Sequence, residues 1–112
     1  MPLENHEPPV VPGSSSCFVT VDGIRIHYRE VDGPDDAIPA IFTHGGGPGS
    51  TGWSNFRLSA GAVSARRRCY FIDFPQFGQS DMVPIGGPVF SWQAARLLQF
   101  MDALGIDKAH LI

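Results

Sequence analysis

The sequence predicts an α/β protein in which an antiparallel hairpin leads into a mostly parallel sheet flanked by helices. Two β-rich runs separated by the turn pair Asp22-Gly23 predict the hairpin. Short apolar runs that alternate with helical patterns predict the parallel strands, because such strands are buried on both faces. The glycine-rich stretch THGGGPGSTGW, residues 43–53, follows the first of these runs and marks the place where a site is expected.

The chain is expected to divide into a short lead-in and one partial domain. Residues 1–16, MPLENHEPPVVPGSSS, are rich in proline and are predicted to be disordered, without the basic and apolar segments of a secretory signal. The domain then occupies residues 17–112. It begins with the hairpin over residues 17–33, and the run AIFT, residues 40–43, is too short and too apolar for anything but a buried parallel strand.

The second half of the chain predicts two helices and two further strands. A weaker helical pattern covers residues 54–65, and CYFIDF, residues 69–74, completes a strand-loop-helix-strand unit. The clearest helix spans residues 91–105, where Ser91 is expected to cap the N-terminus and Gly105 to end the helix in the left-handed conformation. AHLI, residues 109–112, begins a third parallel strand. An uncovered central strand would be an aggregation hazard, so a longer fold is expected.

Composition limits the classes of function. The 112 residues carry a net charge of −3, with 43% hydrophobic and 17% charged residues, as in a soluble globular protein, and a nucleic-acid partner is not expected. The arginines at 66–68 are predicted to form a solvated helix end. No apolar run is long enough to span a membrane, so no membrane partner is expected. Cys17 and Cys69 have no zinc or disulfide pattern, which suggests reduced thiols in a cytoplasmic protein, and the histidines have no metal-binding spacing.

One interpretation of the glycine-rich stretch is a dinucleotide-binding loop. Gly47, Gly49 and Gly52 spell G-x-G-x-x-G after a strand, and Asp73 follows about 20 residues later at the end of the next strand. The match is incomplete because Pro48 lies inside the motif, other residues separate the motif from the strand, and a hairpin does not normally open such a domain. A P-loop is excluded, since no Lys-Ser or Lys-Thr follows the glycines.

The other interpretation is an oxyanion loop. FTHGGGPG is a His-Gly-Gly-Gly-type motif after the third strand, and DFPQFGQSD, residues 73–81, is similar to a D-x-P-G-x-G-x-S-D loop after the fourth. From the hairpin through HGGGPGSTGWSNF to MDALGIDKAHLI, the chain resembles the N-terminal third of the α/β-hydrolases and most closely the meta-cleavage product hydrolases. Those enzymes hydrolyse a C–C bond in 2-hydroxy-6-oxo-dienoates. Gln76 departs from the pattern, which usually has glycine there.

The resemblance implies roles for five residues of the glycine-rich stretch and the following helix. The backbone N–H of Gly46 would donate to the oxyanion, Gly45 and Gly47 would shape the loop around the substrate, and Asn55 would hold the polar dienoate end. His44 is expected to orient the loop through side-chain hydrogen bonds, because the catalytic histidine of this fold comes last in chain order. The resemblance also implies a small-molecule substrate, no cofactor or metal, and a homo-oligomer as an option for the full-length enzyme.

The remaining polar residues are given structural roles. His27 and His110 are expected to be ordinary strand residues, Ser80 and Asp81 to hydrogen-bond their turn, and Trp53 and Phe56 to pack. No G-x-S-x-G occurs, so no nucleophile, acid or base is expected in this chain, and the chain alone is predicted to be catalytically silent.

Three alternatives to a C–C bond hydrolase stay open. An epoxide hydrolase or a prolyl aminopeptidase has a similar loop, a dinucleotide-binding module remains, and so does a non-catalytic interaction protein. Downstream sequence separates them, since Gly-x-Ser-x-Gly supports a serine hydrolase and an aspartate at the nucleophile position supports an epoxide hydrolase or a dehalogenase.

Overall fold

A computed structural model describes residues 13–112 as one mixed sheet with helices on both faces. The sheet has the strand order β1-β2-β4-β3-β5. Its strands are β1 (Ser14–Val21), β2 (Ile24–Val31), β3 (Ala40–Phe42), β4 (Cys69–Ile72) and β5 (His110–Leu111). The helices are α1 (Gly52–Phe56), the 3₁₀ helix η1 (Arg57–Ser59), α2 (Ala60–Ser64) and α3 (Val89–Leu104). The α/β prediction is confirmed.

The hairpin forms as its turn residues predict, but it begins earlier. Val21 pairs with Ile24, so the loop has two residues, and Asp22 and Gly23 have positive φ values of 50° and 75°. Positive φ at both positions matches the right-handed twist of the flanking strands. β1 starts at Ser14 rather than at the predicted Cys17, because residues 14–16 continue the ladder opposite residues 29–31. The rest of the predicted lead-in, residues 1–12, lies outside the described residues.

The centre of the sheet joins antiparallel and parallel pairs through β4. On one side β4 pairs antiparallel with β2, with Tyr28 opposite Ile72, and on the other it pairs parallel with β3, with Phe42 opposite Phe71. β5 pairs parallel with β3, which confirms the predicted third parallel strand. The carboxyl ends of β3 and β4 therefore lie at the same edge of the sheet, and the loops that follow them are neighbours.

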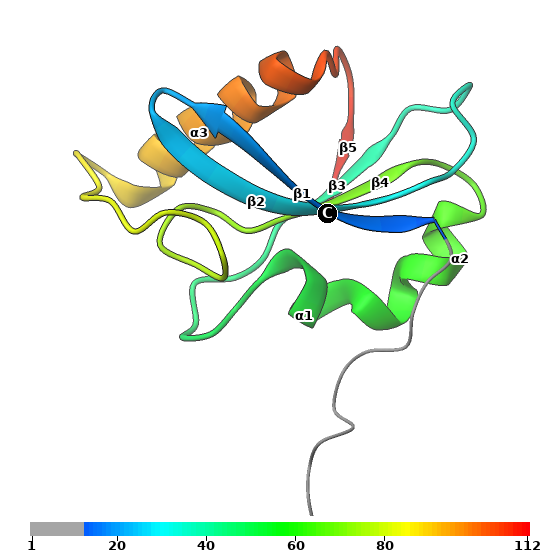
Figure 1. The fold of residues 1–112 in the computed structure, drawn as a ribbon, viewed down its shortest axis with the longest axis horizontal. Coiled ribbons are helices and arrows are strands. Elements are labelled where there is room, and N and C mark those ends of the chain that lie inside the picture. The colour runs from blue at the N-terminus through cyan, green and yellow to red at the C-terminus, as the bar shows by residue number, and fades with distance from the viewer. Residues whose placement is uncertain (1–12) are drawn as a thin grey trace, which may run out of the picture.

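Alternating strand residues build one core on each face of the sheet. Figure 1 shows α3 on one side and α1 and α2 on the other. Phe100 of α3 is fully buried against the cluster that contains Ile41, Tyr70 and Ile72. The cluster on the other face is covered by the helices that follow the glycine-rich loop and consists of Val31, Ala40, Phe42, Ala60, Cys69 and Phe71, with Trp53 and Phe56 packed against it.

Two helix predictions need correction. The single helix expected over residues 54–65 is three short pieces, and α1 starts earlier because Thr51 and Ser54 form a reciprocal capping box. Ser91 does not cap α3. The first turn of α3 is already closed at Pro88, whose carbonyl accepts the Trp92 N–H at 3.0 Å, so Ser91 lies inside the helix.

The end of α3 confirms the prediction for Gly105. This residue has φ of 71°, and the following N–H, of Ile106, donates to the Met101 carbonyl at 2.9 Å. Glycine adopts this left-handed conformation without a steric penalty, and the bond satisfies a carbonyl of the last turn.

The prediction that the arginines at 66–68 form a solvated helix end is wrong for Arg68. They follow α2 in a turn, and Arg68 contacts the carboxylates of Glu30, Asp32 and Asp35 at 2.5 to 2.9 Å. β4 begins at the next residue, and its pairing with β2 brings these acidic side chains to Arg68.

Within residues 13–112, no helix is long and apolar enough to cross a bilayer. The same part of the chain contains no group of three or more His, Cys, Asp or Glu placed to hold a metal ion. Cys17 and Cys69 are both free thiols.

Candidate functional site

The glycine-rich loop lies at the carboxyl edge of the parallel strands. It follows β3, and the loop that follows β4 leaves the sheet on the same side (Figure 1). The two loops and the start of α3 enclose a cavity of about 580 Å³, with Gly45, Gly46, Phe74, Phe77 and Leu97 in its lining. Open α/β sheets bind ligands at this edge. The cavity is therefore the candidate site.

His44 ties the glycine-rich loop to the end of β4. Its Nε2 accepts the backbone N–H of Phe74 at 3.0 Å, and its Nδ1 lies 2.7 Å from the Gly45 carbonyl. Because Nε2 accepts, the neutral ring carries its proton on Nδ1 and donates it to Gly45. The ring also meets Phe77 edge-on, with centroids 4.7 Å apart. The side chain thus makes the contacts expected of a loop-orienting residue.

Gly46 presents bare backbone at the cavity. A Cβ built on Gly45 or on Gly46 meets no atom within 4 Å, so the backbone of both residues is open to an approaching molecule. Among residues 13–112, the Gly46 N–H donates no hydrogen bond to another backbone group. An unpaired N–H at a cavity wall can donate to a ligand oxygen.

Gly47 and Asn55 lie outside this lining. Gly47 begins a tight turn in which its carbonyl accepts the Ser50 N–H at 3.1 Å, and Gly49 in the same turn has φ of 77°. Asn55 is exposed on α1, where its backbone N–H continues the helix by donating to Thr51. The structure therefore brings together Gly45, Gly46 and His44 but does not place Asn55 in the cavity.

The loop after β4 keeps a left-handed turn in spite of its glutamine. Gln76 has φ of 81°, a region that side chains rarely adopt. Its backbone N–H donates to the Asp81 carbonyl at 3.0 Å, and its Oε1 accepts the Val83 N–H at 2.6 Å. These two bonds hold the conformation that glycine adopts without strain. The departure from the family pattern therefore leaves the turn intact.

A buried polar network beside the loop was not predicted. His27 Nδ1 lies 2.8 Å from Asp73 Oδ2, and both side chains are almost fully buried. His27 Nε2 lies 2.6 Å from Ser16 Oγ. Ser80 Oγ accepts the His27 backbone N–H and donates to the Asp73 carbonyl. His27 is thus not the ordinary strand residue expected, and Ser80 links two strands as well as its own turn.

This network and the packing of α1 remove the support for a dinucleotide-binding loop. The Asp73 carboxylate is occupied by His27 and by the Gln79 N–H, so it does not face a ribose. A Cβ on Gly52 would lie 2.6 Å from the Ile72 carbonyl oxygen, which shows that this glycine lets α1 approach β4 closely. The G-x-G-x-x-G spacing therefore has a packing cause here.

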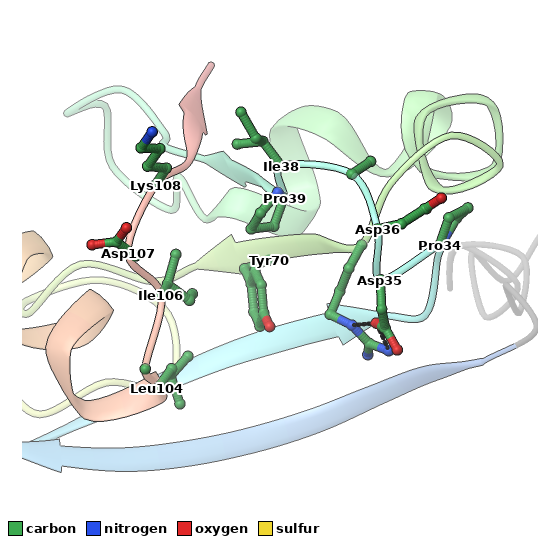
Figure 2. Close-up of a pocket in the computed structure, with 13 residues that line it drawn as sticks. Pro34, Asp35, Asp36, Ile38, Pro39, Tyr70, Leu104, Ile106, Asp107 and Lys108 are labelled. Carbon is green, nitrogen blue, oxygen red and sulfur yellow. Dashed lines mark hydrogen bonds and ion pairs between the residues drawn. The ribbon is translucent and has the colours of Figure 1, made fainter.

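A second cavity, of about 400 Å³, lies at the opposite edge of the sheet, where β3, β4 and β5 begin. Figure 2 shows Tyr70 between the loop of residues 34–39 and the segment of residues 104–108. The ion pair between Arg68 and Asp35 borders this cavity. The cavity lies at the edge that α/β sheets seldom use for ligands.

Burial raises the pKa of side chains in β2 and β4. Desolvation raises the pKa of Tyr28 to about 12 and that of Cys69 to about 11, because the charged forms lose water. The pKa of Tyr70 is raised for the same main reason. Cys69 is therefore a protonated core residue rather than a nucleophile.

Comparison with curated proteins finds dienoate hydrolases among the relatives. The chain is 36% identical over 104 residues to a 2-hydroxy-6-oxononadienedioate/2-hydroxy-6-oxononatrienedioate hydrolase of Burkholderia vietnamiensis, covering 88% of this chain and 35% of the relative. It is 42% identical to a 2-hydroxy-6-oxo-6-phenylhexa-2,4-dienoate hydrolase of Comamonas testosteroni, covering 89% of this chain and 36% of the relative. The chain thus spans about a third of the length of these relatives. No family model matches.

Solved structures agree on the fold. The meta-cleavage product hydrolase CumD of Pseudomonas fluorescens matches with a TM-score of 0.75 and 29% identity, over 85% of this chain and 34% of that one. A haloalkane dehalogenase from Bradyrhizobium elkanii matches with a TM-score of 0.75 and 32% identity, over 88% of this chain and 31% of that one.

Together, the sheet order and the loop define the first third of an α/β-hydrolase fold, as the sequence predicts. Within that superfamily, the resemblance to the meta-cleavage product hydrolases is confirmed by the named relatives. The family is one of hydrolytic enzymes.

Proposed function

We propose that residues 43–51 form the oxyanion loop of a serine hydrolase that cleaves a C–C bond in 2-hydroxy-6-oxo-dienoates, the products of aromatic ring meta-cleavage. The observation that carries the proposal is the open backbone of Gly45 and Gly46 in the cavity at the carboxyl ends of β3 and β4. The names of the curated relatives support the substrate class.

Gly46 has the central chemical role in this proposal. Attack on the 6-carbonyl of the dienoate places negative charge on its oxygen, and the Gly46 N–H would donate to that oxygen. A fixed donor stabilises the charge without reorganisation, and loss of one such donor typically costs about 3 kcal/mol of transition-state stabilisation. His44 would hold the donor in place through the Phe74 N–H and the Gly45 carbonyl.

The other proposed contacts follow from the loop. Gly45 would allow the substrate to approach the backbone, and Gly47 would turn the chain towards α1. The apolar lining from Phe74, Phe77 and Leu97 suits the hydrocarbon part of a dienoate. The binding of the polar dienoate end by Asn55 stays a prediction. Asn55 is exposed on α1 and lies outside the cavity lining.

The 112 residues contain no G-x-S-x-G sequence, so they supply a donor and a binding wall but no family nucleophile. We therefore expect the chain by itself to be silent towards dienoates. No metal or organic cofactor takes part in the proposed reaction, and the proposed ligand is a small molecule.

The test compares the chain alone with a fusion that restores the rest of the fold. The chain would be joined to the segment that follows the matched region in the Comamonas testosteroni relative. Consumption of 2-hydroxy-6-oxo-6-phenylhexa-2,4-dienoate is then followed by absorbance. The proposal predicts turnover by the fusion and none by the chain alone. A folded fusion without turnover, or turnover by the chain alone, contradicts it.

The likeness to a haloalkane dehalogenase supports a second candidate, a hydrolase with an aspartate nucleophile, which also covers the epoxide hydrolases. Coding DNA read across and beyond the Ile112 codon separates the two. Gly-x-Ser-x-Gly in the continuing frame supports the C–C hydrolase, and an aspartate at the serine position supports the second candidate.

A further inference from the structure

The hairpin carries a second constellation of catalytic side-chain types, away from the glycine-rich loop. Ser16 Oγ lies 2.6 Å from His27 Nε2, and His27 Nδ1 lies 2.8 Å from Asp73 Oδ2. A serine, a histidine and a carboxylate are thus in hydrogen-bonded series. Such a triad is recognised by geometry and roles rather than by chain order.

The burial pattern assigns each member a role. His27 and Asp73 are 4% and 3% exposed, whereas Ser16 is exposed on the edge strand β1. The Asp73 carboxylate accepts a hydrogen bond from the His27 Nδ1–H. This bond fixes the tautomer and leaves the Nε2 lone pair directed at the Ser16 hydroxyl. The base is therefore held inside the protein, and the nucleophile faces solvent.

Asp73 is itself held in place. Its Oδ2 also accepts the Gln79 N–H at 3.2 Å, and its backbone carbonyl accepts the Ser80 hydroxyl at 2.6 Å. Ser80 additionally accepts the His27 N–H at 2.8 Å, so the base and its carboxylate are anchored to the same side chain. The imidazole has little freedom to turn away from Ser16.

Arg29 provides a positive charge on the strand paired with Ser16. Arg29 is the direct cross-strand partner of Ser16, so their side chains share one face of the hairpin. Within residues 13–112, Arg29 Nε is buried with no hydrogen-bond partner. Its guanidinium lies over the Trp53 ring, 4.9 Å from the centroid. A positive charge on the residue paired with a nucleophile can stabilise a developing oxyanion.

An aromatic surface adjoins the same position. Phe18 lies opposite His27 in the ladder, with ring centroids 5.0 Å apart, and it is 40% exposed. The guanidinium of Arg25 lies over the Phe18 ring, 3.8 Å from the ring centroid. A ligand's aryl group can contact the part of the Phe18 ring that His27 and Arg25 leave exposed while its carbonyl lies near Ser16.

We propose that Ser16 is an activated nucleophile that accepts acyl groups from small aryl esters, with His27 as general base and Asp73 as the residue that orients it. In this step the Ser16 Oγ bonds to the carbonyl carbon, and its proton passes to His27 Nε2. The positive charge of Arg29, the cross-strand partner of Ser16, would stabilise the oxyanion. The bond between carbon and aryl oxygen then breaks, the aryloxide leaves with that proton, and hydrolysis of the acyl-serine releases the carboxylic acid.

This inference is independent of the proposed dienoate function. The nucleophile of the family pattern lies in a G-x-S-x-G sequence that these 112 residues lack, whereas Ser16 is in β1. A label on Ser16 therefore reports on the hairpin alone, whatever happens at the glycine-rich loop.

The experiment treats the 112-residue chain with 4-nitrophenyl acetate, follows 4-nitrophenolate release, and locates the acetyl group by peptide mass spectrometry. We expect acetylation at Ser16, none there in Ser16→Ala, and a rate reduced about 100-fold or more in His27→Gln. The matched control is Ser15→Ala, because Ser15 is also exposed in β1 and the His27 ring is hydrogen-bonded to Ser16 instead.

Two results would overturn the proposal. One is acetylation of Ser15 to the same extent as Ser16, which indicates general surface reactivity. The other is a rate at Ser16 that is the same in water and in denaturing urea. The urea comparison uses the unchanged chain, so it decides the question even if His27→Gln prevents folding.

Discussion

Replacement of His44 by alanine tests how firmly the glycine-rich loop is tied to the sheet. The substitution removes the acceptor for the Phe74 N–H, the donor to the Gly45 carbonyl and the edge contact with Phe77. At about 1 kcal/mol for each of the two hydrogen bonds and about 0.5–1 kcal/mol for the aromatic contact, the loss is about 2.5–3 kcal/mol. Urea unfolding followed by tryptophan fluorescence measures this change in the free energy of unfolding.

Two variants serve as controls for His44→Ala. His110→Ala makes the same chemical change at an exposed histidine of β5 and should change the free energy of unfolding by less than about 0.5 kcal/mol. His44→Gln keeps a side-chain carbonyl that can accept the Phe74 N–H and should recover part of the loss. The reasoning is refuted if His44→Ala is no more destabilising than His110→Ala.

Two further predictions concern the loop after β4 and the core. Gly78→Ala should destabilise the chain by about 2 kcal/mol or more, because φ is 54° and the new Cβ would lie 2.2 Å from Asp73 Oδ2. Gly86→Ala, where a Cβ meets nothing within 4 Å, should be nearly neutral in the same urea assay. The free energy of unfolding should also fall in alkali. Burial raises the pKa of Cys69 from 9.0 to about 11 and that of Tyr28 from 10.0 to about 12, so their contributions are complete below the lower value of each pair and are lost as pH rises through the higher one. Urea unfolding at a series of pH values, with Cys69→Ala as the comparison, should show a flatter alkaline decline in the variant; equal slopes would contradict the assignment.

Local sequence signals predicted those parts of the fold that local residues determine. The Asp22-Gly23 turn, the apolar runs of β3 and β4 and the glycine at the end of α3 each specify their own conformation. The predicted N-cap of α3 was wrong because the Pro88 carbonyl already accepts the Trp92 N–H, so Ser91 lies inside the first turn. The loop motif likewise singled out His44 and its neighbours, whose roles at the site stay predictions.

The buried network could not be found in this way. Its members are contributed by β1, β2 and the loop after β4, and they meet only because β4 inserts between β2 and β3. Sequence distance gives no indication of that pairing, since 46 positions separate His27 from Asp73. The three carboxylates around Arg68 were missed for the same reason, because β2 and the following loop meet Arg68 only in the folded sheet.

The most direct test of the central claim removes the proposed oxyanion donor. In the fusion with the rest of the Comamonas testosteroni hydrolase, Gly46→Pro deletes the backbone N–H, whereas Gly46→Ala keeps it and adds a methyl group that meets no atom within 4 Å. Turnover of 2-hydroxy-6-oxo-6-phenylhexa-2,4-dienoate should fall by about 10²–10³ in Gly46→Pro and stay within a few-fold in Gly46→Ala. Equal turnover by the two variants, with both folded, would contradict the assignment of Gly46.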